Sequence, residues 1–363
     1  MSPATAPRRA SAVRVLELDV RTGRERIARA ADLPALLERG DLVVVNDAAT
    51  LPASLRWLER GEAELRLVAV GEVTATSVSV TAALLGAGDH RVRTEDRGAP
   101  PKVRIGERLT LEGGLTARVT RIDACSDRLV DVTFEAKSLA AIWQGIYRAG
   151  HPVQYAHVSP RLALWDVQNV WAARPWAVEM PSAGRALTAE TLVALDRRGV
   201  AVAAITHAAG LSSTGDPAID ARLPLPERFE VSAEAALAVR RTRARGGRVL
   251  AVGTSVVRAL ESASRASRSD RIEAARGITN LILRPGDRRE IVDGVLTGVH
   301  EADTTHFTLL GAFAEREALD GALALAERAG LLGHEFGDAW LVWGVPAGGR
   351  TVTAGEVGAT FAA

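Results

Sequence analysis

The stretch from residue 247 to residue 262, GRVLAVGTSVVRALES, constrains the fold more than any other part of the chain. A short β-branched run at 249–252 lies between glycines, which is typical of a strand buried on both faces of a sheet. Gly253-Thr254-Ser255 then interrupts the run, and apolar residues recur at helical spacing. We therefore predict a strand, a tight turn, and a helix capped by Thr254 or Ser255.

The same turn is a candidate ligand site. The first backbone N–H groups of a helix have no partner inside it, so those of Gly253, Thr254 and Ser255 suit a carboxylate or another anion. Arg258, one turn into the helix, could pair with a ligand carboxylate. Two plainer interpretations stay open: Gly253 only permits a tight turn, and Arg258 forms an ion pair with Glu261 at i+3.

Composition narrows the class of protein. Of the 363 residues, 47% are hydrophobic and 25% are charged, as in an ordinary globular protein. Forty-five basic and forty-four acidic residues leave a net charge of +1, so there is no global electrostatic case for nucleic-acid binding, although a local basic patch could still bind it. The single cysteine, Cys125, excludes an internal disulfide and a multi-thiolate metal site. With no apolar run long enough to span a membrane, we expect a cytoplasmic protein without membrane contact.

The order of predicted strands and helices indicates two units. After a strand at 13–18, a helix at 31–38 and a strand at 41–47, short β-type runs follow one another without helices, as in a small antiparallel barrel. From Thr188 onward helices and strands alternate, with a strand at 200–206, a helix from Ser232 and a polar loop at 262–269. We predict an α/β sandwich domain, residues 1–54 and 155–363, interrupted by an inserted antiparallel β-barrel, residues 55–154.

Several polar side chains follow predicted strands. Asn46 and Asp47 end one strand and His207 ends another, and ligands of α/β proteins bind at the carboxyl ends of strands. His207 is the leading acid/base candidate, because imidazole titrates near neutral pH; the alternative is a histidine hydrogen-bonded to nearby backbone. Ser182 and Gly184, in a turn before the helix that Thr188 caps, could offer further N–H donors or simply form the helix entry.

Taken in order, the motifs resemble the S-adenosylmethionine:tRNA ribosyltransferase-isomerase family of queuosine biosynthesis. The matching segments run across nearly the whole chain, and it is their ordered combination that carries the resemblance. They are GDLVVVND at 40–47 with Pro52-Ala53, PSAG at 181–184 with Leu187-Thr188, Thr206-His207 with Gly210-Leu211, GTSVVRALES at 253–262, VDG at 292–294 with Leu296-Thr297 and His300, and FGDA at 336–339.

The resemblance implies an α/β domain with an inserted β-barrel and a specific reaction. In this family the ribosyl part of S-adenosylmethionine passes to an aminomethyl-deazaguanine base of tRNA and is isomerised, with release of adenine and methionine and without a metal. The implied catalytic residues are His207, Asp293 and Asp338. The implied residues that bind S-adenosylmethionine are Asn46, Asp47, Ser182, Gly184, Gly253, Thr254, Ser255, Arg258 and His300.

Other readings of these motifs also remain. His300, Asp303 and His306 have a spacing that could ligate a metal if the loop folded back, but the family has no such metal.

The chain also departs from the family in its loops, with Ala48-Ala49 for Thr-Arg, 185–188 (RALT) for Leu-His-Phe-Thr, 224–227 (PLPE) for Met-His-Ser-Glu, and 297–302 (TGVHEA) for Thr-Asn-Phe-His-Leu-Pro. Drift within one activity, a small nucleoside or amine acceptor in place of tRNA, and a non-catalytic nucleotide-binding module would each explain these departures.

Overall fold

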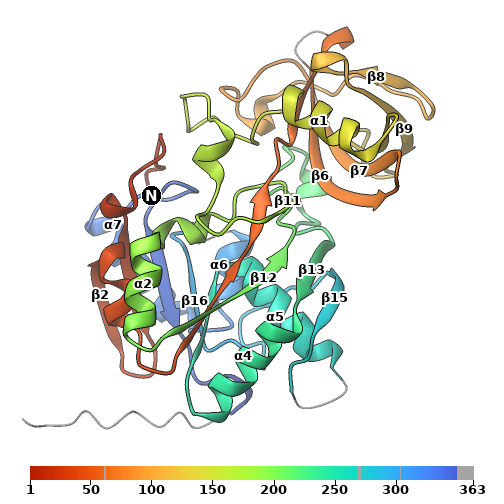
Figure 1. Ribbon diagram of the computed structural model, residues 1–363. Coiled ribbons are helices and arrows are strands. Elements are labelled where there is room, and N and C mark those ends of the chain that lie inside the picture. Colours follow the sequence, from red (N-terminus) through yellow and green to blue (C-terminus); the bar gives the residue numbers. More distant parts are fainter. Residues whose placement is uncertain (61–62, 268–270, 303, 350–363) are drawn as a thin grey trace, which may run out of the picture.

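The computed structural model describes residues 1–60, 63–267, 271–302 and 304–349 and contains two large sheets (Figure 1). The larger is a nine-stranded mixed sheet, and the smaller is a six-stranded antiparallel sheet that Figure 1 shows beside it at the upper right. The predicted fold class, an α/β domain with an inserted antiparallel barrel, is confirmed.

Four parallel strands form the centre of the larger sheet. In the order β12, β3, β14 and β16 each strand runs parallel to the next, so their carboxyl ends share one edge. Antiparallel and edge strands extend the sheet on both sides. Across the sheet the strands are β15 (Ala275–Thr279), β13 (Glu227–Val231), β12 (Ala201–His207), β3 (Leu42–Asn46), β14 (Val249–Val252), β16 (Gly294–Gly298), β17 (Ala339–Trp343), β1 (Arg14–Asp19) and β2 (Arg24–Arg29).

The central strands are apolar on both faces because helices and loops cover both. Leu42 and Val44 pack into one core with residues of the helices on one face of the sheet, while Val43 and Val45 pack into a second core on the opposite face. This alternation is the period of two that a strand imposes on its side chains. The uninterrupted apolar runs at 42–45 and 249–252 therefore predicted their strands correctly.

The six-stranded sheet curls into a barrel. Its strands follow the order β5, β6, β7, β10, β9 and β8, and a β-bridge between Trp57 and Leu111 joins the two edges. One helix packs on its core through Ile142 and Ile146. The strands are β5 (Ser54–Trp57), β6 (Ala63–Val73), β7 (Ser77–Leu85), β8 (Arg108–Thr110), β9 (Thr116–Ile122) and β10 (Leu129–Glu135), and the helix is α1 (Leu139–Ala149).

The remaining elements connect these sheets. A two-stranded sheet pairs β4 (Ala48–Thr50) with β11 (Arg174–Ala177). The helices are α2 (Ala189–Arg197), α3 (Pro217–Asp220), α4 (Ala233–Ala244), α5 (Thr254–Ala266), α6 (Thr305–Leu310) and α7 (Arg316–Arg328). The short 3-10 helices are η1 (Ala10–Ala12), η2 (Ala30–Leu36), η3 (Leu58–Arg60), η4 (Thr94–Asp96), η5 (Glu112–Gly114), η6 (Leu164–Val167), η7 (Ser182–Ala186) and η8 (Ala347–Gly349).

Two local predictions were wrong and two were confirmed. The segment predicted as an α-helix at 31–38 is the 3-10 helix η2, which contains Pro34; proline has no N–H to donate and disfavours a continuous α-helix. The predicted polar loop at 262–269 belongs to α5 as far as Ala266, and residues 268–269 lie outside the described residues. Thr188 caps α2 through its side chain, as predicted, and Ser232, predicted as the start of a helix, is the N-cap of α4.

Among the residues that the structure describes, no helix combines the length and the apolar character needed to cross a membrane.

Candidate active site

The candidate site lies at the carboxyl edge of the parallel strands. Asn46 ends β3, His207 ends β12, Gly253 follows β14, and Thr297 is near the end of β16. Because these strands are parallel neighbours, their polar ends meet at one edge, where loops can contact a ligand.

Asn46 holds the backbone of His207. Its side-chain Nδ2 donates to the carbonyl oxygen of His207 at 2.9 Å, and its Oδ1 accepts the His207 N–H at 2.9 Å. Its Oδ1 also accepts the N–H of Ala48 at 3.1 Å. The carboxamide predicted to bind S-adenosylmethionine is therefore engaged in positioning His207.

The His207 side chain is buried, and it makes no hydrogen bond to any described residue. It is 0% exposed, and neither Nδ1 nor Nε2 has a partner among the described residues. Nε2 lies 3.5 Å from Oε2 of Glu227. Burial lowers the pKa of His207 from 6.5 to about 4, although the nearby Glu227 opposes this shift. At neutral pH the imidazole is therefore neutral and can accept a proton.

Glu227 joins His207 to Arg258. One oxygen of its carboxylate contacts both His207 and Nη1 of Arg258, and the other accepts the N–H of Gly210 at 2.6 Å. Arg258 also donates from Nε to the carbonyl of Leu281 at 2.9 Å. Its Nη2 is buried and has no partner among the described residues, so it is a free cationic donor beside His207.

The structure corrects the alternative role of Arg258. Glu261 does not pair with it; instead the Glu261 carboxylate accepts the backbone N–H groups of Glu290, Ile291 and Val292 at 2.8–3.0 Å. The sequence motif placed Arg258 and Glu261 on one helix, but it could not show that a loop more than 25 residues later would take up Glu261.

The turn before α5 is built on Gly253. Gly253 itself is the N-cap, with φ of 98°, and no side chain caps the helix, so the prediction that Thr254 or Ser255 caps it was wrong. A positive φ costs glycine little and would strain other residues, which explains the glycine here. The Gly253 N–H, predicted to face an anion, instead donates to the Leu296 carbonyl at 2.8 Å, and the Val256 N–H donates to the Gly253 carbonyl at 3.1 Å. The N–H groups of Thr254 and Ser255 are left without partners inside the helix, at the strand edge.

Ser182 and Gly184 lie in η7, beside this turn. The Ala183 side chain lies 3.6 Å from the position that a Cβ on Gly253 would occupy. Gly184 is buried, and a side chain there would collide with Asn169 at 2.7 Å. The structure thus places the η7 turn beside the α5 turn. The sequence alone could not show this, because the two motifs are far apart in the chain.

Two histidines extend the edge. His300 Nε2 lies 2.8 Å from Oγ1 of Thr297, and the rings of His300 and His306 stack with centroids 4.6 Å apart. Burial lowers the pKa of His306 and lowers that of His300 well below its ordinary value. Asp303, the third member of the predicted metal-ligand spacing, lies outside the described residues.

The predicted aspartates have different surroundings. The Asp338 carboxylate, at the start of β17, accepts bonds from Arg8, Arg14 and the N–H of Leu332 at 2.8–3.0 Å. Asp293 precedes β16, so it lies at the opposite edge from His207, where it accepts the N–H groups of Val249 and Ala347 at 2.8 Å each. The structure therefore does not bring Asp293 together with the other candidates.

Asp47 lies beside Asn46 at the strand edge. Its Oδ1 accepts a hydrogen bond from the Thr206 hydroxyl at 2.5 Å, and its carbonyl accepts the N–H groups of Ala173 and Arg174. Asp47 thus ties β12 and the segment before β11 to the end of β3. The side chain keeps partial exposure and faces the same edge as His207.

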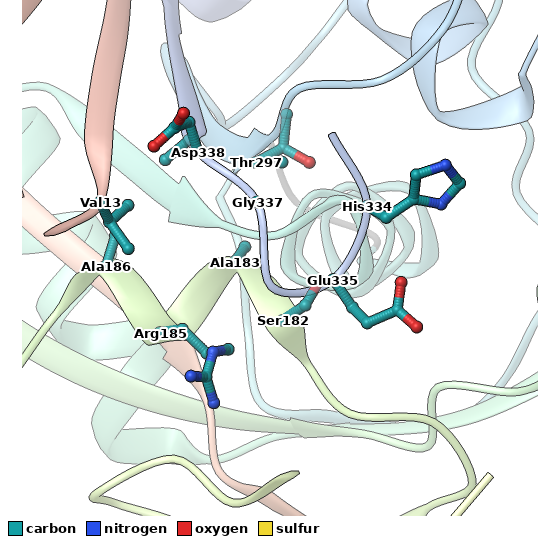
Figure 2. Close-up of a pocket in the computed structure, with 12 residues that line it drawn as sticks. Val13, Ser182, Ala183, Arg185, Ala186, Thr297, His334, Glu335, Gly337 and Asp338 are labelled. Atoms are coloured by element: carbon teal, nitrogen blue, oxygen red, sulfur yellow. The ribbon is translucent and has the colours of Figure 1, made fainter. Parts of the chain in front are cut away.

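Two pockets flank the edge. The first is a narrow pocket lined by Ser182, Arg185, Thr297 and Asp338, with His334 and Glu335 at one side (Figure 2). The second, with a cavity volume of about 240 Å³, lies between the barrel and the larger sheet, and Leu225 and Glu227 line it. Three of the segments that depart from the family pattern, 185–188, 224–227 and 297–302, therefore contribute residues to these pockets.

The sequence analysis did not predict two carboxylates near the site. It names Glu227 only as the end of a segment that departs from the family pattern, and it does not name Glu179. Glu179 accepts hydrogen bonds from the Tyr155 hydroxyl and from the Ser212 N–H, the latter at 2.9 Å, and burial raises the pKa of Glu179 to about 7. Its partners lie 24 and 33 residues away, and no local pattern could have indicated them.

The pKa of His207 predicts acid sensitivity. As pH falls below 6.5 the unfolded chain binds a proton at this histidine before the native state does, so the free energy of unfolding falls until about pH 4. The expected loss from this group is about 3 kcal/mol. Urea denaturation at pH 7, 5 and 4 should show a smaller fall for His207→Gln than for the wild type. If the free energy of unfolding falls equally with pH in both proteins, the argument from burial of His207 is contradicted.

Comparison with known proteins gives a consistent result. The model of a family described as queuosine biosynthesis protein matches residues 2–342. The S-adenosylmethionine:tRNA ribosyltransferase-isomerase of Sorangium cellulosum is 32% identical, covering 90% of both chains. Proteins of the same name from Acidithiobacillus ferrooxidans and Thermus thermophilus are 34% and 32% identical, covering 92% and 89% of this chain and 91% and 90% of their own. The crystal structure of S-adenosylmethionine tRNA ribosyltransferase from Thermotoga maritima is 23% identical, with a TM-score of 0.49, over 93% of this chain and 95% of that one.

Proposed function

Because this chain belongs to the queuosine biosynthesis protein family, we propose that it is an S-adenosylmethionine:tRNA ribosyltransferase-isomerase. It transfers the ribosyl moiety of S-adenosylmethionine to a 7-aminomethyl-7-deazaguanine base of tRNA and isomerises it to epoxyqueuosine, releasing adenine and methionine. The observation that carries this function is the match to curated relatives over about nine tenths of both chains. That extent favours the tRNA reaction over a small acceptor and over a non-catalytic module.

The substrate itself supplies much of the driving force. The sulfonium of S-adenosylmethionine is a strong leaving group and acidifies the neighbouring C5′ protons, so the protein must orient the acceptor and place a base near C5′. We propose that this step needs no metal. The reaction therefore calls for a group that is neutral at working pH and accepts a proton in a dry environment.

We assign the acid/base role to His207. Its imidazole is neutral, buried and without a hydrogen-bond partner among the described residues. Glu227, 3.5 Å away, would stabilise the imidazolium that forms when His207 takes a proton. Arg258 in turn orients the Glu227 carboxylate. Asn46 acts as a positioning residue, because its carboxamide fixes the backbone of His207.

We propose that the two turns at the edge hold S-adenosylmethionine. The first-turn N–H groups of α5, at Thr254 and Ser255, suit its carboxylate, because the positive end of the helix dipole lies there. Ser182 and Gly184 lie beside that turn and extend the surface toward Thr297 in the first pocket. The roles of Asp47, His300 and Asp338 are to shape this edge through the contacts described above.

The larger pocket suits the acceptor base. It lies between the barrel and the sheet and reaches Glu227, whose negative charge complements an aminomethyl group protonated near neutral pH. A base that undergoes chemistry must leave its stack and enter such a cavity. We propose that tRNA approaches along this junction and that the enzyme works in the cytoplasm.

Product analysis tests the function. Purified protein with S-adenosylmethionine and tRNA carrying the aminomethyl-deazaguanine base should release adenine and methionine, and the tRNA should gain the mass of the transferred carbon skeleton. Matched reactions contain tRNA without that base, or no tRNA, and should release neither product. Adenine released without tRNA would favour a small acceptor, and S-adenosylhomocysteine would indicate methyl transfer. Binding of S-adenosylmethionine without turnover on the modified tRNA would contradict the proposed activity.

A further inference from the structure

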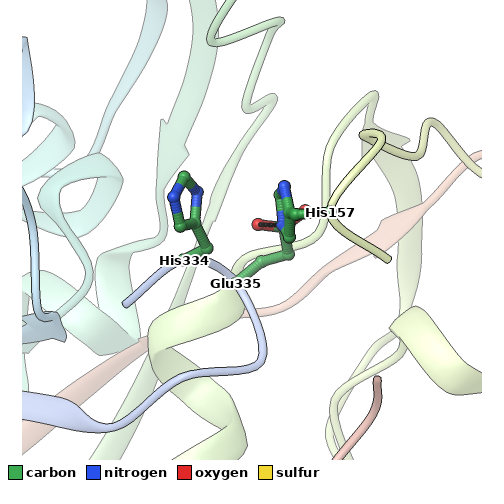
Figure 3. A group of neighbouring side chains, drawn as sticks. All are labelled: His157, His334 and Glu335. Atoms are coloured by element: carbon green, nitrogen blue, oxygen red, sulfur yellow. Dashed lines mark hydrogen bonds and ion pairs between the residues drawn. The ribbon is translucent and has the colours of Figure 1, made fainter. Parts of the chain in front are cut away.

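We propose that His157, His334 and Glu335 form a binding site for a divalent transition-metal ion, with Zn²⁺ as the best match (Figure 3). One ligand atom from each residue lies within 4.8 Å of the others. The site lies at the side of the first pocket, which His334 and Glu335 also line. It borders the pocket proposed for S-adenosylmethionine, but it shares no residue with the proposed acid/base group of His207, Glu227 and Arg258.

The three side chains converge from two distant segments. His157 lies between α1 and η6, whereas His334 and Glu335 precede β17. Nε2 of His157 is 3.1 Å from Oε2 of Glu335, and the rings of His157 and His334 have centroids 4.3 Å apart with an interplanar angle of 38°. Figure 3 shows the imidazole of His334 facing the His157–Glu335 pair. An ion bound here would join the segment that leaves the barrel to the loop before β17.

The distances are close to those that a tetrahedral ion requires. Zinc–nitrogen and zinc–oxygen bonds of 2.0–2.2 Å place neighbouring ligand atoms roughly 3.3 Å apart. The His157–Glu335 pair already has this separation. The widest separation, at most 4.8 Å, must shrink by roughly 1.5 Å, which rotation of the exposed His334 side chain can provide.

The backbone that carries His334 is held in an unusual conformation. His334 has φ of 66° and is the non-glycine residue with positive φ in the described part of the chain. Hydrogen bonds fix the loop around it: Gly337 N–H donates to the His334 carbonyl at 2.9 Å, and Asp338 N–H donates to the Leu332 carbonyl at 2.7 Å. Such strained positions are retained where the surrounding structure enforces them, often at functional sites. Here this backbone conformation places two consecutive potential metal ligands, His334 and Glu335, beside His157.

The donor set indicates which ion fits. Two imidazoles and one carboxylate favour Zn²⁺ and similar first-row ions over Mg²⁺ or Ca²⁺, which prefer oxygen ligands alone. Three protein ligands leave a fourth position for water or for a ligand in the first pocket. The competing explanation is an ordinary His157–Glu335 ion pair with His334 resting against it, and this would bind no metal tightly.

Metal titration decides between these explanations. The full-length protein, dialysed against a chelator, is titrated with Zn²⁺ by calorimetry and with Co²⁺ by visible spectroscopy. We expect one saturable Zn²⁺ ion per chain, a tetrahedral Co²⁺ spectrum and a raised Tm. Absence of saturable Zn²⁺ binding, or a Co²⁺ spectrum typical of the hydrated ion, would overturn the proposal.

Three variants locate the ion. His157→Ala, Glu335→Gln and His334→Asn should each weaken Zn²⁺ binding at least about 10-fold, because each removes one ligand. Asparagine is chosen at 334 since it tolerates positive φ. His151→Asn is the matched control and should bind like the wild type. Undiminished binding in Glu335→Gln, with its melting curve in chelator unchanged, would place the ion elsewhere and refute the site. None of these measurements depends on ribosyl transfer, so they stand apart from the test of the proposed function.

Discussion

His207→Gln should lower the rate of adenine release by about 10²–10⁴-fold, the usual contribution of a general acid or base. Glutamine fills a similar volume but cannot accept a proton at working pH. The native imidazole is neutral because burial lowers its pKa to about 4, and its nitrogens are not committed to protein partners among the described residues. We therefore expect kcat and kcat/KM to fall together, as when an interaction of the transition state is lost.

Binding measurements separate this effect from misfolding. S-adenosylmethionine affinity, measured by calorimetry, should change little in His207→Gln, and the melting curve should stay cooperative. His151→Asn, a change of similar kind in a histidine outside the edge, should keep the wild-type rate. A His207→Gln enzyme that releases adenine at the wild-type rate would remove His207 from the mechanism and leave the strand edge without its base.

The layers of the fold could be predicted because each rests on a local pattern. The apolar runs at 42–45 and 249–252 show no polar alternation, so they had to be strands covered on both sides. The runs between 63 and 134 lack intervening helical periodicity, which left an antiparallel sheet as the simplest arrangement. The position of His207 at a strand end followed from the same reasoning.

The partners within the site could not be predicted, because they depend on packing between distant segments. Glu227 and Arg258 are 31 residues apart, and they meet only because α5 packs beside β13. His157 and Glu335 are separated by 178 residues. Asp293 shows a different limitation: its Val-Asp-Gly motif matched the family pattern, but it precedes β16 and therefore lies at the edge opposite His207.

Glu227→Ala should cost roughly 3–5 kcal/mol of folding free energy, the usual effect of leaving one partner of a buried ion pair alone. Arg258 is only 6% exposed, so its guanidinium cannot regain water when the carboxylate is removed. The N–H of Gly210 loses its acceptor as well. Urea denaturation at pH 7 measures the change. Asp320→Ala, which breaks the exposed Arg316–Asp320 pair, is the matched control and should change stability by no more than about 1 kcal/mol.

A double-mutant cycle shows whether the cost comes from the stranded charge. When Glu227→Ala is combined with Arg258→Met, no buried cation remains, and the double variant should be more stable than the sum of the two single changes predicts. Strict additivity would mean that Glu227 and Arg258 do not interact in solution. In that case Arg258 would not hold the Glu227 carboxylate beside His207, and the orienting role assigned to Arg258 would be wrong. A positive coupling would instead show that the Glu227 carboxylate stabilises the fold as well as serving the proposed chemistry. A substitution of Glu227 would then change both stability and activity.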